Sequence, residues 1–336
     1  MNDINASEQH FIPDRRRNKL VRALGSWETL LLAVGIFIFF LNTQASPYFL
    51  DPWNLSDATF NFTEKAMIAF AMALVFISGE IDLSVASIIA LVSTCMGFAV
   101  QLGYDTTALV LIALVVGALC GAFNGYLVAI MGLPSIVVTI GTLSLFRGIA
   151  YIVLGDQAYS GYPDSFAFFG QGYVWWVITF EMVLFAVTAL VFYVLLHKTS
   201  FGRSTLAIGN NPTAALFSGI RVARVKFILF VLTGIMSAIA AICLTSRLGS
   251  TRPSIAVGWE LEIVTMVVLG GVNILGGSGS ISGVFIAAIV MGMVTFGLGL
   301  LNVPGIVMSI VVGLLLIGVI ALPIVIRRVR HKADRA

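Results

Sequence analysis

The sequence predicts an all-α polytopic membrane protein. Hydrophobic residues make up 59% of its 336 positions, charged residues make up only 10%, and the mean hydropathy is +1.03. A soluble domain carries roughly 25% charged residues, so lipid must solvate much of this surface. The apolar residues also gather into runs of about 20, the length that one helix needs to cross a bilayer.

Ten such runs can be distinguished, and each must be helical because every backbone group needs a partner within lipid. The first run follows several basic residues, as in a signal peptide. We expect it to be retained as a membrane span, because every later run also needs the membrane. The predicted spans cover residues 26–46, 60–79, 83–103, 107–131, 133–154, 174–196, 225–246, 259–276, 281–300 and 304–326.

The basic residues predict the orientation of the chain, because Lys and Arg near span ends concentrate on the cytoplasmic side. Fifteen of the nineteen lie in three segments, at 15–22, 198–226 and 327–335. An even number of spans places all three segments on one side of the membrane. We therefore expect a cytoplasmic basic N-terminal tail at 1–25, a transmembrane domain at 26–326, a cytoplasmic loop at 197–226 and a cytoplasmic basic C-terminal tail at 327–336.

The motifs of common enzyme and cofactor sites are absent. The sequence has no GxxxxGK[ST] phosphate loop, no HExxH and no GxSxG. Its three histidines lie in the tails or the basic loop, and its three cysteines lack metal-ligand spacing. The formal charge of +3 does not suggest nucleic-acid binding. We therefore expect no catalytic residue, metal, cofactor or nucleic-acid partner, and any ATPase must be another subunit.

Polar residues inside the apolar runs are the candidates for a substrate pathway. A charged side chain at the bilayer centre costs about 3 kcal/mol, so such residues face protein or a water-filled cavity. We expect a transport path to be lined sparsely, because a solute that binds tightly is not released. The candidate pathway residues are Asp82, Asn124, Thr139, Thr142, Arg147 and Glu262.

Asp82 lies in the segment 79–87, which interrupts a long apolar stretch. One interpretation is a short interfacial turn in which Asp82 caps the next helix. The other is a broken helix that faces a water-filled cavity. Arg147, within a later span, is expected to pair with Asp82 or with a backbone carbonyl.

Two glycine patterns predict close packing and a tight connection. Gly117 and Gly121 form a GxxxG motif that favours helix–helix contact, and Asn124 follows it on the same helix. The glycine-rich segment 270–283 predicts a non-helical connection. It is not a dinucleotide-binding loop, because no β-strand precedes it. Glu262, just before this segment, is expected either to anchor the interface or to line the pathway.

Four stretches resemble, in this order, the permease subunits of sugar-type ATP-binding-cassette (ABC) importers, a family with ribose, xylose, arabinose, galactose, rhamnose and autoinducer-2 systems. They are GEIDLSVAS, PSIVVTIGTLSLFRG, TSFGRSTLAIGNNPTAALFSGIRVARVK and ELEIVTMVVLGGVNILGGSGSISG, within a resemblance that spans about residues 50–326. Glu80 departs from the pattern, because many relatives have a second glycine there. The turn thereby loses a residue that adopts positive φ easily.

The resemblance implies a dimer of permeases, identical or paralogous, each with about ten spans arranged as in the cobalamin-importer permease. It implies a cytoplasmic ATPase dimer and a periplasmic or extracellular solute-binding protein. The implied function is ATP-driven uptake of a monosaccharide or sugar-like solute across the lipid of the bacterial inner membrane. Rhamnose and autoinducer-2 are among the candidate solutes.

The loop 197–226 resembles the coupling region of this family, which contacts the ATPase. Its sequence predicts a helix over Pro212–Ile220, with Asn211 as the N-cap and Pro212 at the first helical position. The alternative is a basic loop that sets topology and contacts nothing. The ATPase-coupling candidates are Gly202, Arg203, Gly209, Asn210, Asn211, Ala214 and Gly219.

Three other functions stay open at this point. An ion-gradient-driven secondary transporter would use Asp82 or Glu262 for the coupling ion and would need no ATPase. An intramembrane enzyme is disfavoured by the missing catalytic pairs. A scaffold subunit would transport nothing alone. Recovery of an ATPase with the chain would distinguish the importer from all three.

Overall fold

The structure is a computed structural model that describes residues 27–60, 62–155, 157–315 and 317–318. The predicted tails at 1–25 and 327–336 therefore lie outside the described residues, as does much of the last predicted span. Almost all regular structure in the described part is helical, and two pairs of short strands complete it.

The first half of the chain supplies helices that match most of the predicted spans. Their bounds are α2 Trp27–Ala45, α3 Pro52–Phe60, α4 Thr63–Ile77, α5 Val85–Gln101, α6 Thr106–Gly125 with the π-helical turn Tyr126–Ile130, and α7 Ser135–Leu154. α3 and α4 meet at an angle of 46°. The second predicted span, 60–79, starts at this bend, and α4 is its helical part.

The segment between α7 and α9 contains the strands and two short helices. They are β1 Tyr159–Ser160, the 3-10 helix Asp164–Phe166, α8 Phe168–Gln171, β2 Tyr173–Trp175 and β3 Ile178–Thr179. β2 and β3 pair antiparallel, and β1 pairs antiparallel with β4 Ser250–Thr251.

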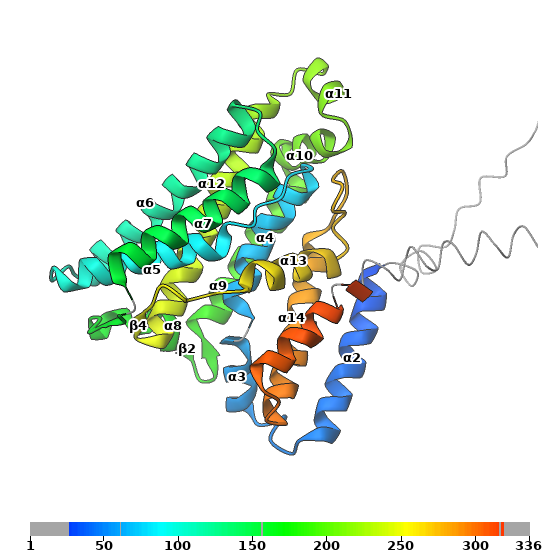
Figure 1. The fold of residues 1–336 in the computed structure, drawn as a ribbon. Coiled ribbons are helices and arrows are strands. Elements are labelled where there is room, and N and C mark those ends of the chain that lie inside the picture. Colours follow the sequence, from blue (N-terminus) through cyan, green and yellow to red (C-terminus); the bar gives the residue numbers. More distant parts are fainter. Residues whose placement is uncertain (1–26, 61, 156, 316, 319–336) are drawn as a thin grey trace, which may run out of the picture.

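The second half contains the loop helices and the remaining membrane helices. They are α9 Phe180–Lys198, α10 Ser200–Asn210, α11 Pro212–Phe217, α12 Val222–Leu248, α13 Trp259–Leu269 and α14 Ile281–Leu300, followed by a helix over Gly305–Leu315. Figure 1 shows α10 and α11 at one end of the molecule and α3 at the opposite end.

Two predicted spans differ from the structure. The span at 174–196 begins later, at Phe180, because the Thr179 side chain accepts a hydrogen bond from the amide of Met182 (3.1 Å) and so caps α9 there. The span at 259–276 is helical only to Leu269, a length of 11 residues. The indole Nε1 of Trp27 donates a hydrogen bond to the Leu269 carbonyl (2.7 Å). The last carbonyls of a helix have no partner within it, so this bond satisfies one of them where α13 ends.

Among the described residues, six helices are long and apolar enough to cross a membrane, or seven if α3 and α4 are counted as one bent span. The chain is thus an all-α, multi-pass membrane protein. α5, with 17 residues, and the helix Gly305–Leu315 are apolar but shorter.

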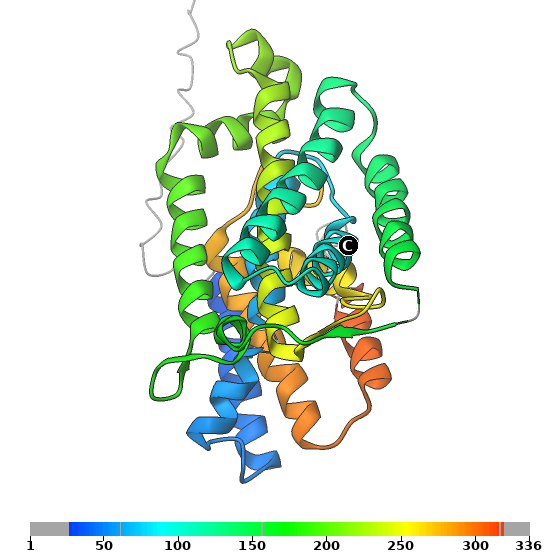
Figure 2. The same cartoon turned by 90° about the vertical axis from the view of Figure 1, so that its left-hand side faces the viewer.

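α4 is the central helix. All its residues except Lys65 are buried, and it packs against α9, α12, α13 and α14. A helix that is apolar on every side is expected at such a position. α2, in contrast, packs mainly on α14 and exposes most of its apolar side chains. Figure 2 shows α12 through the middle of the molecule, with α9 and α7 on either side of it.

The predicted GxxxG contact is confirmed between α6 and α12. A side chain at Gly117 or Gly121 would collide with the backbone of Gly234 or Phe230, respectively. Glycine at both positions therefore lets the two helix backbones touch.

Candidate functional site

Asp82 and Asn124 meet in a buried polar network at the connection between α4 and α5. The Asp82 Oδ1 atom accepts hydrogen bonds from the amide (2.9 Å) and hydroxyl (2.6 Å) of Ser84, and the Asn124 side-chain amide donates to the same hydroxyl (2.7 Å). All three residues are fully buried. Within the described part of the chain, Asp82 Oδ2 and Asn124 Oδ1 have no hydrogen-bond partner. The network therefore keeps two acceptors for a further donor.

α7 supports this network from the side. The Ser135 hydroxyl accepts from the amide of Ile81 (3.2 Å), and Thr139 Oγ1 lies 2.8 Å from the Ser135 carbonyl and 3.4 Å from that of Ile81. Thr142 lies one turn further on, with its hydroxyl 3.4 Å from the Thr139 carbonyl. The connection between α4 and α5 thus brings together three of the predicted residues, Asp82, Asn124 and Thr139.

Arg147 takes the carbonyl alternative of its two predicted pairings. Its guanidinium donates to the carbonyls of Pro253 and Ile255, both at 2.8 Å, and of Ala86 at 3.1 Å. Because these carbonyls belong to separate segments, Arg147 ties α7 to the start of α5 and to the connection before α13. Asp82 takes no part in these bonds.

Asp82→Asn and Arg147→Ala are expected to destabilise the protein independently, because the two side chains share no partner. We expect the double variant to lose the sum of the single losses to within about 0.5 kcal/mol. Unfolding of the detergent-solubilised protein measures this. A coupling energy above about 1 kcal/mol would show that the two groups interact after all.

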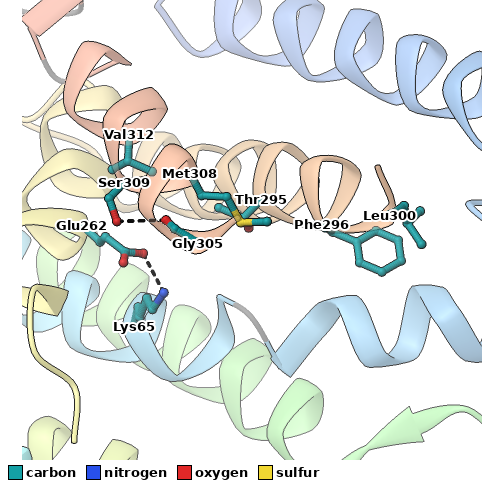
Figure 3. A pocket seen from close by; sticks show the side chains of 10 residues that line it. Lys65, Glu262, Thr295, Phe296, Leu300, Gly305, Met308, Ser309 and Val312 are labelled. Atoms are coloured by element: carbon teal, nitrogen blue, oxygen red, sulfur yellow. Dashed lines mark hydrogen bonds and ion pairs between the residues drawn. The ribbon is translucent and has the colours of Figure 1, made fainter. Parts of the chain in front are cut away.

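Glu262 lies apart from this network, in a pocket of about 350 Å³. Its carboxylate pairs with the ammonium of Lys65 (2.6 Å), which also lies 4.8 Å from the centre of the Trp259 ring. Figure 3 shows the ion pair on one side of the pocket, facing the final described helix. The pocket is lined by Lys65, Glu262, Thr295, Phe296, Gly299, Leu300, Gly305, Met308, Ser309 and Val312.

A second ion pair joins α4 to α12, and its two partners were not among the predicted site residues. Glu64, only 1% exposed, receives two parallel hydrogen bonds from Arg247, at 3.0 and 2.8 Å. Beside it, the Glu181 carboxylate accepts from the Thr63 hydroxyl (3.0 Å). In the sequence, Arg247 lies outside the three basic segments. The signal available was the Thr63-Glu64-Lys65 run, because charges at the start of an apolar run require partners.

The loop 197–226 forms two helices, α10 and α11. Asn211 caps α11 through a bond from the amide of Ala214 (2.9 Å), with Pro212 at the first helical position, as predicted. α11 ends at Phe217, before the predicted Ile220. Gly219 follows with φ of +84°, in the region that favours glycine. Arg203 is exposed, and among the described residues its guanidinium bonds locally, to the hydroxyl of Ser200 (2.9 Å).

The end of α10 contacts the end of α4 and the glycine-rich segment. A side chain at Gly209 would overlap the carbonyl oxygen of Ile77, and that oxygen already accepts from the amide of Gly277 (2.9 Å). Asn210 donates to the carbonyl of Gly277 (2.9 Å). Of the candidate coupling residues, Gly209 therefore touches the end of α4, and Asn210 touches the glycine-rich segment beside it.

Glu80 and Lys226 form an ion pair at this same end. Glu80 is the residue that departs from the sequence pattern, and Lys226 is the last basic residue of the loop. The pair fastens the start of α12 to the α4–α5 connection. The glutamate that replaces the usual glycine at position 80 therefore has a specific cationic partner in this chain.

A bundle of apolar helices, with paired polar groups inside and a helical loop joined to its core at one end, places the chain in the class of multi-pass membrane proteins. The chain belongs to the family of permease components typified by the branched-chain amino acid transport system, whose model matches residues 54–320.

Curated relatives cover nearly the whole chain. The autoinducer 2 import system permease protein LsrD of Klebsiella pneumoniae is 36% identical over 301 residues, which are 88% of this chain and 90% of that protein. LsrD of an Enterobacter species is also 36% identical, over 88% of this chain and 92% of its own. LsrD of Escherichia coli O9:H4 is 36% identical over 300 residues, 88% of this chain and 91% of that protein. No solved structure matches.

This chain is therefore a permease subunit of an ABC importer and a multi-pass protein of the inner membrane. ATP hydrolysis belongs to a separate ATPase subunit, and a solute-binding protein is a further partner. The permease itself is not an enzyme.

Proposed function

We propose that this chain forms, with a second permease subunit, the membrane path of an importer for a sugar-like solute. The observation that carries the proposal is the 36% identity to autoinducer 2 import permeases along 88% of the chain. Autoinducer-2 is the first candidate solute, and rhamnose is another sugar-like candidate. The second permease is either identical or paralogous.

We further propose ten membrane-embedded helices, arranged as in the cobalamin-importer permease, with both termini and the loop 197–226 in the cytoplasm. α5 supports this count, because its 17 residues are the least that a span requires. α13, at 11 residues, reaches only about half-way across and enters the bilayer as a half-span.

Each group of polar residues has a proposed role. The solute path is lined or supported by Asp82, Asn124, Thr139 and Thr142. Of these, Asp82 and Asn124 offer their free acceptor atoms to a solute. Arg147 positions the segments around that path, and Glu262 contacts the solute in the pocket of Figure 3. The loop 197–226 contacts the ATPase dimer, and its movement reaches α4 through Gly209 and Asn210.

Purification and reconstitution test this function. The tagged chain, purified from its native membrane, is expected to bring its ATPase and second permease with it. Proteoliposomes holding that assembly should take up autoinducer-2 only with internal ATP and the solute-binding protein. Liposomes holding this chain alone should take up none.

Uptake by the chain alone, abolished by an uncoupler, would instead show an ion-gradient-driven transporter. Uptake of leucine in place of autoinducer-2 would retain the importer and overturn the proposed solute.

A further inference from the structure

The pocket between α4, α13, α14 and the helix Gly305–Leu315 has the size and the walls of a small-molecule site. Its volume of about 350 Å³ lies within the range of about 300–1000 Å³ that such sites occupy. Most of its lining is apolar. Four polar side chains interrupt that lining, namely those of Lys65, Glu262, Thr295 and Ser309 (Figure 3).

These four groups retain unused hydrogen-bonding capacity. Within the described residues, the Glu262 carboxylate uses only Oε2, and the Lys65 ammonium, which has three N–H groups, bonds only to that oxygen. The hydroxyl of Thr295 faces the carbonyl of Met291 (3.0 Å), and that of Ser309 faces the carbonyl of Gly305 (3.2 Å). With their protons engaged, both hydroxyls keep lone pairs as acceptors. The pocket therefore offers donors and acceptors close together.

Mixed donors and acceptors match a solute that carries several hydroxyl groups, since each hydroxyl both donates and accepts. The Lys65–Glu262 pair is neutral as a whole, so the pocket does not favour a net anion or cation. A zwitterionic amino acid would have to break the 2.6 Å pair to reach either charge. The hydroxyl groups of a solute can bond to the free atoms of Lys65 and Glu262 while the ion pair stays intact. Such binding is also weak enough to permit release, as conduction requires.

We propose that this pocket is a subsite for a neutral, polyhydroxylated solute on its way through the membrane, recognised by the Lys65–Glu262 pair with Ser309 and Thr295. The inference rests on the proposed function and adds to it the place and chemistry of one binding step.

Protection of an introduced cysteine tests the subsite. Ser309→Cys is built into a chain whose three native cysteines are replaced by alanine, and the complete importer is reconstituted. A small methanethiosulfonate reagent is expected to label this position at least threefold more slowly with saturating autoinducer-2 than without it. Leucine at the same concentration should leave the rate unchanged. Ser282→Cys, an exposed serine of α14 that lies outside the pocket, is the matched control and should show no protection.

Variants of the ion pair complete the test. Glu262→Gln and Lys65→Met, each combined with Ser309→Cys, should remove the protection while the ATPase still copurifies. Equal labelling rates at position 309 with and without autoinducer-2, in an importer that transports it, would overturn the subsite alone. Absence of autoinducer-2 uptake by the unmodified importer would instead overturn the proposed function. Protection by leucine but not by autoinducer-2 would overturn the assignment to a polyhydroxylated solute.

Discussion

Gly209→Ala is expected to abolish solute-stimulated ATP hydrolysis by the assembled importer, with a fall of at least tenfold. The added methyl group would overlap the carbonyl oxygen of Ile77, at the end of α4. Backbone atoms cannot rotate away from such an overlap as a flexible side chain can. α10 must therefore move off α4, and the bond from Asn210 to the Gly277 carbonyl is lost with that movement. A movement that begins at the ATPase would no longer reach the central helix.

The measurement is the ATPase rate of the reconstituted importer with loaded binding protein, compared between variants. Gly141→Ala is the matched control, because it makes the same change within α7, where the added methyl group meets no described atom beyond its own turn of helix within 4 Å. Both variants should reach the membrane and bring the ATPase with them on purification. Equal rates for Gly209→Ala and Gly141→Ala would show that the contact between α10 and α4 does not transmit the signal.

Glu64→Gln is expected to cause the largest loss of stability among single conservative changes. It removes the carboxylate that pairs through two hydrogen bonds with Arg247, in a position only 1% exposed. Removing one partner of a fully buried ion pair costs about 3–5 kcal/mol, and because the Arg247 side chain is 27% exposed the expected loss is at the lower end, about 3 kcal/mol. The free energy of unfolding in detergent measures the loss.

Glu181→Gln makes the same substitution at an equally buried carboxylate nearby. Among the described residues it accepts a hydrogen bond from the Thr63 hydroxyl, which a glutamine oxygen can also accept, so the expected loss is below about 1.5 kcal/mol. Similar losses for the two variants would mean that the two hydrogen bonds between Glu64 and Arg247 add nothing to the free energy of unfolding.

Sequence patterns predicted the helices and their ends well where interactions between neighbouring residues determine them. The predicted span 281–300 coincides with α14, and the span 26–46 differs from α2 by one residue at each end. An apolar run of this length can satisfy its backbone in lipid only as a helix. The cap at Asn211 was also predictable, because capping involves only neighbouring residues.

Features that depend on distant partners were not predictable in this way. α13 stops at Leu269, where Trp27, 242 residues earlier, bonds to its last carbonyl. The apolar run itself continues past that point. The partner of Glu262 was equally hidden, because Lys65 lies 197 residues away. Asp82 was found from its cost in an apolar stretch, but the bond that Asn124 donates to the Ser84 hydroxyl, 40 residues away along the chain, required the fold.

The pairing of α4 with α12 also has a consequence for the synthesis of the chain. Glu64 leaves the ribosome 183 residues before Arg247. At about 5–20 residues per second, this interval lasts roughly 10–40 s. Throughout that time the helix that will occupy the centre of the bundle carries a carboxylate without its cation. The contact between α4 and α12 that this pair fastens can therefore form only after α12 has been made, although α4 is among the first helices to be synthesised.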